Sequence, residues 1–275
     1  MSLKDRLWIG LDILSKPHGF HNLFTYLFKQ SGVFITREGY RLRFDTKTKR
    51  YVFNLLLLNL DHGVIFSDKE GYWRLDHDRK IVILPNNIKF KLEGFDTLIF
   101  AETFLYDIHY DPNLEGKVVV QAGGFTGDTA LYYATHGALV YSFEPDPISY
   151  KLALENISLN PELSERVTMK NYAIGRDGVV KFPVNPRGSG GSSIYEQKGL
   201  ETIEVRSVSI STILREFNID EPYLLDLDIK GAEFDVIDDP AISKFRKVRI
   251  EYSPDLVNKR DDGRELRAIQ VFIAN

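Results

Sequence analysis

The 275-residue chain has no cysteine, and this absence excludes disulfide frameworks, thiol nucleophiles and cysteine–zinc sites. It also lacks a long apolar run, since the most apolar stretch, residues 52 to 60, is far too short to cross a bilayer. The N-terminus has neither the apolar segment nor the small-residue cleavage site of a signal peptide. We therefore expect a soluble, cytoplasmic protein without a membrane span.

Neither sign of charge dominates the sequence. The chain has 35 Lys and Arg against 39 Asp and Glu, a formal net charge of −4, and the two signs are mixed along it. Nucleic-acid-binding proteins carry a basic patch or stripe, so no nucleic-acid partner is expected. No group of His, Asp and Glu has metal-ligand spacing, and we expect no metal. His109 is interpreted as an ordinary surface or helix-end residue.

The first third of the chain predicts a separate module, which we place at residues 1–94. Residues 2–30 have apolar side chains at helical spacing, with a break around Pro17 and Gly19. Residues 33–92 have short β-rich runs separated by turn residues, which predicts an antiparallel meander. Its aromatic side chains are interpreted mainly as core, although such a meander could also form a homodimer contact.

From residue 95 to 275 the pattern predicts a second domain. A helix is expected within residues 95–110, and after residue 113 strand-like and helix-like segments alternate, which is typical of a mostly parallel sheet with helices on both faces. The strands are predicted at residues 117–121, 139–143, 167–172, 179–183, 202–208, 223–228 and 247–252. The helices are predicted at residues 126–136, 147–159, 211–217, 232–238 and 263–274, and residues 187–193 read as a loop.

The strongest local signal is the segment from Val118 to Asp128, in which a buried strand enters a glycine-rich turn that opens a helix. Glycines allow a sharp turn and a close approach to a ligand, and the helix N-terminus offers unpaired amides. Ligands of open α/β sheets bind at the carboxyl ends of the strands. A purely structural turn is the alternative. The cofactor-binding residues predicted here are Gln121, Gly123, Gly124, Thr126, Gly127 and Asp128.

The next strand ends at Glu144, about 20 residues beyond the glycines. An acid at this position can accept hydrogen bonds from both ribose hydroxyls of a bound nucleoside. Ribose binding fits a nicotinamide dinucleotide and S-adenosylmethionine equally. However, Ala122 stands where the dinucleotide fingerprint G-x-G-x-x-G requires its first glycine, which disfavours a nicotinamide cofactor.

Two further segments follow predicted strands and face the same edge of the sheet. Asn171, Tyr172 and Ala173 are suited to border an adenine ring. The segment from Asp228 to Glu233 reads Asp-Ile-Lys-Gly-Ala-Glu and brings two acids and Lys230 to the same edge. A salt-bridged strand–helix junction is the alternative interpretation of that set.

Together these motifs resemble the FkbM-type family of S-adenosylmethionine-dependent methyltransferases, over about residues 102 to 251. The matching pieces, in the family's order and spacing, are Gly123-Gly-Phe-Thr-Gly-Asp128, Glu144-Pro-Asp-Pro147, Asn156-Ile-Ser-Leu-Asn160, Ser192-Ser193 and Asp228-Ile-Lys-Gly-Ala-Glu233. The resemblance implies a Rossmann-like class I methyltransferase core and S-adenosylmethionine as cofactor. It also implies a hydroxyl acceptor on a sugar, glycan or small metabolite, and cofactor contacts from Pro145 and Glu102.

The chain departs from the family pattern at two motif positions. Gln121 replaces the acid of the first motif, and Lys230 replaces the first glutamate of the last one. The family's sheet also has two more strands where residues 263–274 predict a helix. The departures keep a second hypothesis open, that of a non-catalytic cofactor-binding or interaction module. An RNA methyltransferase is disfavoured by the acidic balance.

Methyl transfer to a hydroxyl requires alignment of the reactants and benefits from a general base. Asp228 is the first candidate for the base or for the group that orients the acceptor. Lys230 could stabilise the developing alkoxide or pair with Asp228. Glu233 is a weaker catalytic candidate, since a residue one helical turn later often serves packing or capping.

Overall fold

The structure is a computed structural model of the chain. It describes residues 10–62, 74–184, 201–229 and 236–251, except for residues 38, 40, 47–48, 77, 85 and 105–106. The chain forms two compact units, Met1–Tyr106 and Asp107–Asn275. The first unit thus includes a helix, α4 (Thr97–Phe104), that the sequence analysis placed in the second domain. The functional division after residue 94 stays a prediction.

The N-terminal unit is a mixed α/β module. Residues 10–15 are helical and turn sharply at Pro17 into the next helix, so the expected break is confirmed. The elements that follow are α2 (Gly19–Phe28), the antiparallel pair β1 (Gly32–Ile35) and β2 (Arg41–Phe44), α3 (Lys49–His62), and the antiparallel meander β3 (Arg74–Asp76), β4 (Ile81–Ile83) and β5 (Lys89–Lys91). The predicted meander is therefore confirmed for its last three strands.

The helix α3 corrects the prediction that residues 33–92 are β throughout. Its buried side chains are Val52, Phe53, Leu55 and Leu56, a spacing that places them on one face of a helix. Phe53 stacks on Tyr26 of α2 and tilts against Phe34 of β1, so α3 covers an aromatic core.

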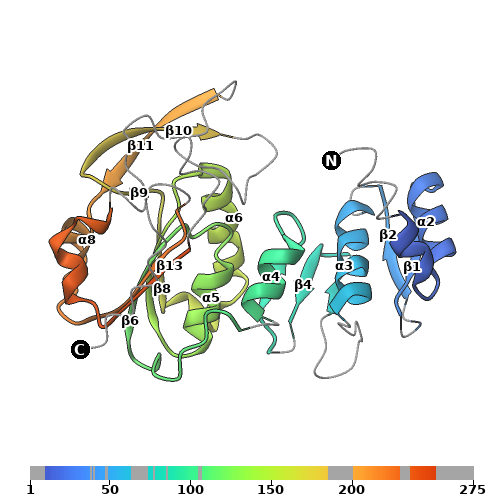
Figure 1. Cartoon of the computed structure of the whole chain (residues 1–275), viewed down its shortest axis with the longest axis horizontal. Helices are drawn as coiled ribbons and strands as arrows, with labels where there is room; N and C mark the ends of the chain where they lie inside the picture. The colour runs from blue at the N-terminus through green and yellow to red at the C-terminus, as the bar shows by residue number, and fades with distance from the viewer. Residues whose placement is uncertain are drawn as a thin grey trace. The chain divides into compact units, whose positions relative to one another are not determined.

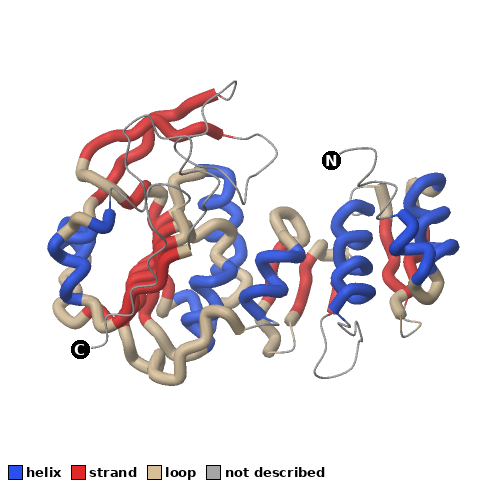
Figure 2. Tube along the Cα trace, in the orientation of Figure 1, coloured by secondary structure: helices blue, strands red, loops and turns tan. Residues whose placement is uncertain are grey.

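The C-terminal unit is built on a five-stranded, fully parallel sheet with the order β13-β12-β6-β7-β8 (Figures 1 and 2). Its strands are β6 (Val118–Ala122), β7 (Leu139–Phe143), β8 (Val167–Lys170), β12 (Pro222–Leu227) and β13 (Lys247–Ile250). In sequence order, counted from β8, this is the 3-2-1-4-5 arrangement of a Rossmann-like sheet. The predicted fold class is confirmed.

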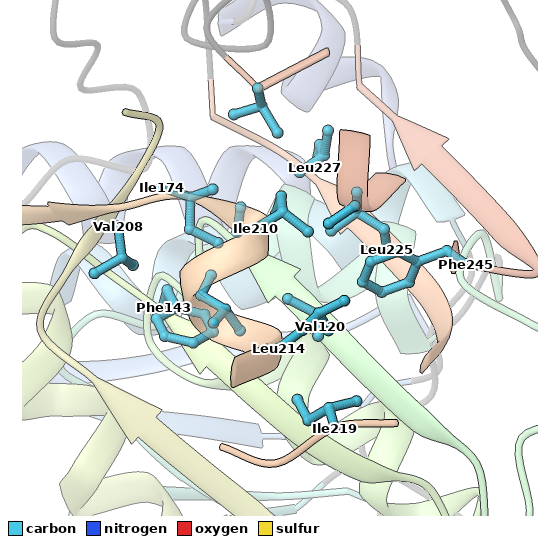
Figure 3. Close-up of a cluster of buried hydrophobic side chains, with 14 residues drawn as sticks. Val120, Phe143, Ile174, Val208, Ile210, Leu214, Ile219, Leu225, Leu227 and Phe245 are labelled. Carbon is cyan, nitrogen blue, oxygen red and sulfur yellow. The ribbon is translucent and has the colours of Figure 1, made fainter. Parts of the chain in front are cut away.

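Helices cover both faces of this sheet. Figure 1 shows α8 on one side and α5 and α6 on the other. The helices are α5 (Asp128–Thr135), α6 (Pro147–Ser158), the short α7 (Pro161–Ser164), α8 (Ile210–Glu216) and the 3-10 helix η1 (Pro240–Lys244). The face under α8 is a dense apolar core, which includes Val120, Phe143, Leu214, Leu225 and Leu227 (Figure 3).

Two predicted strands do not join the parallel sheet. The strands β10 (Gly178–Val184) and β11 (Glu201–Val208) pair antiparallel, and β11 also pairs with the two-residue β9 (Ala173–Ile174). A strand needs a crossover connection, usually a helix, to join a parallel sheet beside the strand before it, and no helix separates β9 from β10. The antiparallel pair β10–β11 therefore forms a separate sheet with β9. The predicted loop at residues 187–193 and the helix at residues 263–274 lie outside the described residues, as does most of the helix predicted at residues 232–238.

Candidate active site

The glycine-rich turn between β6 and α5 is tied to both neighbouring strands. The amides of Gly123 and Gly124 donate to the carbonyl of Phe143 at 2.9 and 3.0 Å, and the amide of Asp228 donates to the carbonyl of Ala122 at 3.0 Å. Gly123 has φ +85°, and a Cβ there would collide with the carbonyl oxygen of Asp228. The turn therefore brings the ends of β6, β7 and β12 into direct contact.

Glu144, at the end of β7, points into this turn. Its side chain is only 7% exposed. One carboxyl oxygen accepts from the amide of Phe125 and the other from the amide of Asp146, both at 2.8 Å. Burial raises the pKa of Glu144 to about 8, although the two amide hydrogen bonds act in the opposite direction. The nearby negative charges of Asp146 and Asp228 raise it further.

Asn171 fixes the backbone that follows Glu144. Its side-chain amide donates to the carbonyls of Glu144 and Pro145 at 2.8 and 3.0 Å. Tyr172 follows it; its hydroxyl accepts from the guanidinium of Arg206 at 3.0 Å, and that guanidinium lies over its ring. The structure thus brings Asn171 and Tyr172 to the same edge as Glu144, while Ala173 is buried in β9.

The first turn of α5 holds the remaining predicted residues of the motif. Asp128 is buried and accepts from the hydroxyl of Thr129. The carbonyl of Thr126 accepts from the side chain of Asn156 at 2.8 Å, which fastens the turn to α6. The hydroxyl of Thr126 is buried and has no hydrogen-bond partner among the described residues. Gly127 caps the helix with φ +80°.

A row of polar side chains lies under this edge, on the sheet face opposite the apolar core. Ser142, Gln121, Asp226 and Arg249 are neighbours in register across four adjacent strands. The hydroxyl of Ser142 donates to the side-chain oxygen of Gln121 at 2.8 Å. The predicted cofactor residue Gln121 is buried, and this hydrogen bond of its side chain links β6 to β7.

Asp226 is the centre of a buried network that the sequence analysis missed. Its carboxylate accepts from the hydroxyl of Tyr133 at 2.6 Å, and that hydroxyl accepts from Arg249 at 2.5 Å. The ring nitrogen Nδ1 of His109 lies 3.2 Å from Arg249 and 3.7 Å from Asp226. The interpretation of His109 as an ordinary surface residue is wrong, because the ring is largely buried in this network; burial lowers its pKa and raises that of Tyr133.

The proposed catalytic residues are only partly described. Asp228 is exposed at the carboxyl end of β12, next to the glycine turn and close enough to Glu144 to affect its pKa. Lys230 and Glu233 lie outside the described residues. Glu102 belongs to α4 of the N-terminal unit, and its proposed contact with the cofactor stays a prediction.

The turn has the features that a nucleoside cofactor requires. The hydroxyl of Thr126 is buried without a hydrogen-bond partner among the described residues, and a buried carboxyl group, Glu144, binds the amide of the adjacent Phe125. Together with the strand order, this arrangement defines a Rossmann-like α/β domain of the class I methyltransferase type.

The FkbM methyltransferase domain model matches residues 119–270, more than half of the chain. The chain therefore belongs to the FkbM methyltransferase family. This membership confirms the predicted family, the class of enzyme and the cofactor, S-adenosylmethionine.

Solved structures similar to the chain are also methyltransferases. The METTL16 methyltransferase domain is 15% identical with a TM-score of 0.41, over 79% of this chain and 69% of that one. The N-terminal domain of human METTL16 in complex with SAH is 12% identical with a TM-score of 0.33, over 79% and 72%. A SAM-dependent methyltransferase from Agrobacterium tumefaciens is 15% identical with a TM-score of 0.25, over 37% and 39%. A search of curated proteins found no match.

Replacement of Gly123 by alanine tests how tightly the turn is built. We expect Gly123→Ala to lower the free energy of unfolding by about 3 kcal/mol, because a left-handed alanine and a steric overlap with the carbonyl of Asp228 both cost energy. Gly116→Ala is the matched control, since Gly116 also has positive φ but faces open space, and it should cost about 1 kcal/mol. Urea denaturation measures both values; equal losses would show that the contact with Asp228 adds nothing.

Proposed function

We propose that the protein transfers a methyl group from S-adenosylmethionine to a hydroxyl of a sugar, glycan or small metabolite in the cytoplasm. The observation that carries this proposal is the pairing, at one edge of the sheet, of a buried carboxyl group, Glu144, with an exposed carboxylate, Asp228. The buried group suits a bound ribose, and the exposed one suits an acceptor that arrives from solvent. Family membership supports the same reading.

The chain's own residues would hold the cofactor as follows. Glu144 would accept hydrogen bonds from the ribose hydroxyls, while Asn171 keeps the backbone after β7 in place through its two carbonyl contacts. The backbone of the glycine turn would lie against the cofactor, and the match of this segment to the family model supports that assignment. Tyr172 would border the adenine.

The bound cofactor supplies an electrophilic methyl group on a positively charged sulfur. As the carbon–oxygen bond to the acceptor forms and the carbon–sulfur bond breaks, the acceptor hydroxyl must lose its proton. Asp228 is the group we assign to receive that proton and to orient the hydroxyl, because its side chain is exposed beside the glycine turn.

Calorimetric titration and a transfer assay test this proposal together. The intact protein should bind S-adenosylmethionine and transfer labelled methyl to members of a panel of hydroxylated sugars, but not to the same sugars with every hydroxyl acetylated. Asp228→Asn should lower turnover at least about 100-fold and change cofactor affinity less than about threefold. Asp220→Asn, at an exposed aspartate in the same unit, is the control and should leave both unchanged.

A specific observation favours a second function, that of a cofactor-binding module without catalysis. Gln121 carries no charge and its side-chain oxygen is already used by Ser142. If the protein binds S-adenosylmethionine but transfers methyl to no acceptor, and Asp228→Asn changes nothing, this second function takes precedence. Failure of the intact protein to bind the cofactor would contradict both.

A further inference from the structure

The helix α2 has large apolar side chains on its solvent-exposed face and small or polar residues at its buried positions. Its buried residues are Gly19, Asn22 and Thr25. Asn22 is fully buried and its side chain exchanges two 2.8 Å hydrogen bonds with the backbone of Ile35 in β1, next to which α2 lies in Figure 1. Asn22, Thr25 and Tyr26 thus attach α2 to its own unit, whereas Phe20, Phe24, Leu27 and Phe28 are exposed.

The outward face of α2 is a continuous aromatic ladder. Phe20, Phe24 and Phe28 are 76%, 46% and 72% exposed, and Leu27 beside them is 60% exposed. The three rings follow one another at helical spacing, with centroid distances of 6.3 and 5.0 Å. Contiguous exposed apolar patches of this kind mark surfaces that meet a partner or a membrane.

Basic residues outnumber acidic ones in the segments that flank α2 in the sequence. Residues 10–62 contain eight Lys and Arg and four Asp and Glu. Among the described residues from 10 to 50, five basic residues are exposed: Lys29, Arg37, Arg41, Arg43 and Arg50. The two described acids in this range, Asp12 and Asp45, are half-buried and each is paired with a lysine. Lys29 follows Phe28 directly.

We infer that the aromatic ladder of α2 docks the protein on an anionic membrane surface. Phenylalanine and leucine on one exposed helix face are typical of helices that lie in the lipid interface, and here the basic side chains come from the flanking segments, since α2 itself has no Lys or Arg. Each Lys or Arg near an anionic surface adds to the attraction. Ten residues of helix are about 15 Å long, so α2 can lie on a bilayer but cannot span it. Within the described part of the chain, no helix has the length and apolarity to cross a membrane.

A second copy of the chain is a less suitable occupant. In a two-fold dimer the same patch of both subunits meets, so the basic residues next to this face, such as Lys29, would approach those of the other subunit. That repulsion opposes association, whereas the phosphate groups of an anionic bilayer neutralise the same charges.

Vesicle co-sedimentation of the full chain tests this inference. We expect the protein to partition at least about tenfold more strongly onto vesicles of phosphatidylcholine with phosphatidylglycerol than onto phosphatidylcholine alone, with loss of that preference in high salt. The triple variant Phe20→Ser, Phe24→Ser, Phe28→Ser should lose binding to both. Lys29→Glu with Arg43→Glu should lose only the preference for anionic vesicles. Val179→Ser, which removes an exposed apolar side chain of the C-terminal unit, should bind like the wild type.

Sedimentation velocity separates the alternative. A wild-type chain that ignores anionic vesicles but is dimeric, and becomes monomeric in the triple variant, would overturn the inference and assign the ladder to a homodimer interface. A monomeric wild type that ignores both vesicle types would overturn it as well. Circular dichroism checks whether the triple variant remains folded. We expect that it does, because all three side chains are exposed.

Discussion

Replacement of Glu144 by alanine should abolish detectable binding of S-adenosylmethionine. If the carboxylate accepts both ribose hydroxyls, the variant loses two charge-assisted hydrogen bonds, and together these correspond to an affinity decrease of at least about 100-fold. The variant also leaves the amides of Phe125 and Asp146 without their acceptor, so the turn that carries Gly124 loses its support. Isothermal titration at pH 8.5 measures the effect.

A conservative variant separates the two contributions. Glu144→Gln keeps an oxygen that can accept from one of the two amides but removes the charge. We expect it to remain folded and still to bind at least about tenfold more weakly than the wild type. Glu162→Gln, at an exposed glutamate of α7, is the control and should bind normally. Normal affinity of Glu144→Gln would contradict the assignment of this residue to the ribose.

The same carboxyl group should make binding depend on pH. Its pKa of about 8 means that the free protein holds a proton there at neutral pH, and a bound ribose favours the ionised form. Affinity for S-adenosylmethionine should therefore rise from pH 6.5 to 8 and level off above it.

The effect of pH on the stability of the free protein has the opposite sign. The unfolded chain releases this proton near pH 4.5 and the folded one near pH 8, so the free energy of unfolding falls as pH rises between these values. Glu144→Gln should remove both trends.

The parts of the site that the sequence revealed are local in the chain. Between Val118 and Glu144 the strand, the glycine turn, the helix and the acid follow one another within a single β–α–β unit, so their spacing alone predicted that they meet. The same holds for Asn171, because it follows the next parallel strand. For α3 the local signal was misleading, because Tyr51, Val52 and Phe53 favour strands; the burial of Val52, Phe53, Leu55 and Leu56 at helical spacing shows that tertiary packing prevailed.

The buried network could not be predicted because its members come from four distant segments. His109, Tyr133, Asp226 and Arg249 meet only after β12 and β13 have been added beside β6 and α5 has covered that face. One signal was present: Asp226 stands within the apolar run Leu-Leu-Asp-Leu of a buried strand, and a charge in that position needs a partner. The identity of the partner was not encoded nearby.

Loss of a single oxygen from this network should be among the most destabilising conservative changes in the C-terminal unit. Tyr133→Phe removes the hydroxyl that joins Asp226 to Arg249 and leaves a buried carboxylate without its closest donor. We expect the free energy of unfolding to fall by about 2 to 4 kcal/mol, measured by urea denaturation. Tyr132→Phe is the matched control: the neighbouring hydroxyl donates to the exposed Asp107, and its loss should cost less than about 1 kcal/mol.

A double-mutant cycle then shows whether the network acts as a unit. Once Asp226→Asn has removed the buried charge, Tyr133→Phe leaves no carboxylate unpaired, so its cost should shrink by at least about 1 kcal/mol. Strictly additive losses would mean that Tyr133 and Asp226 stabilise the fold independently. Because Asp226 is in β12 and Asp228 directly follows the last residue of that strand, coupling within the network would also fix the end of β12 against the glycine turn. The expected consequence is that Tyr133→Phe weakens cofactor binding although Tyr133 lies beneath the site, in the layer that supports it.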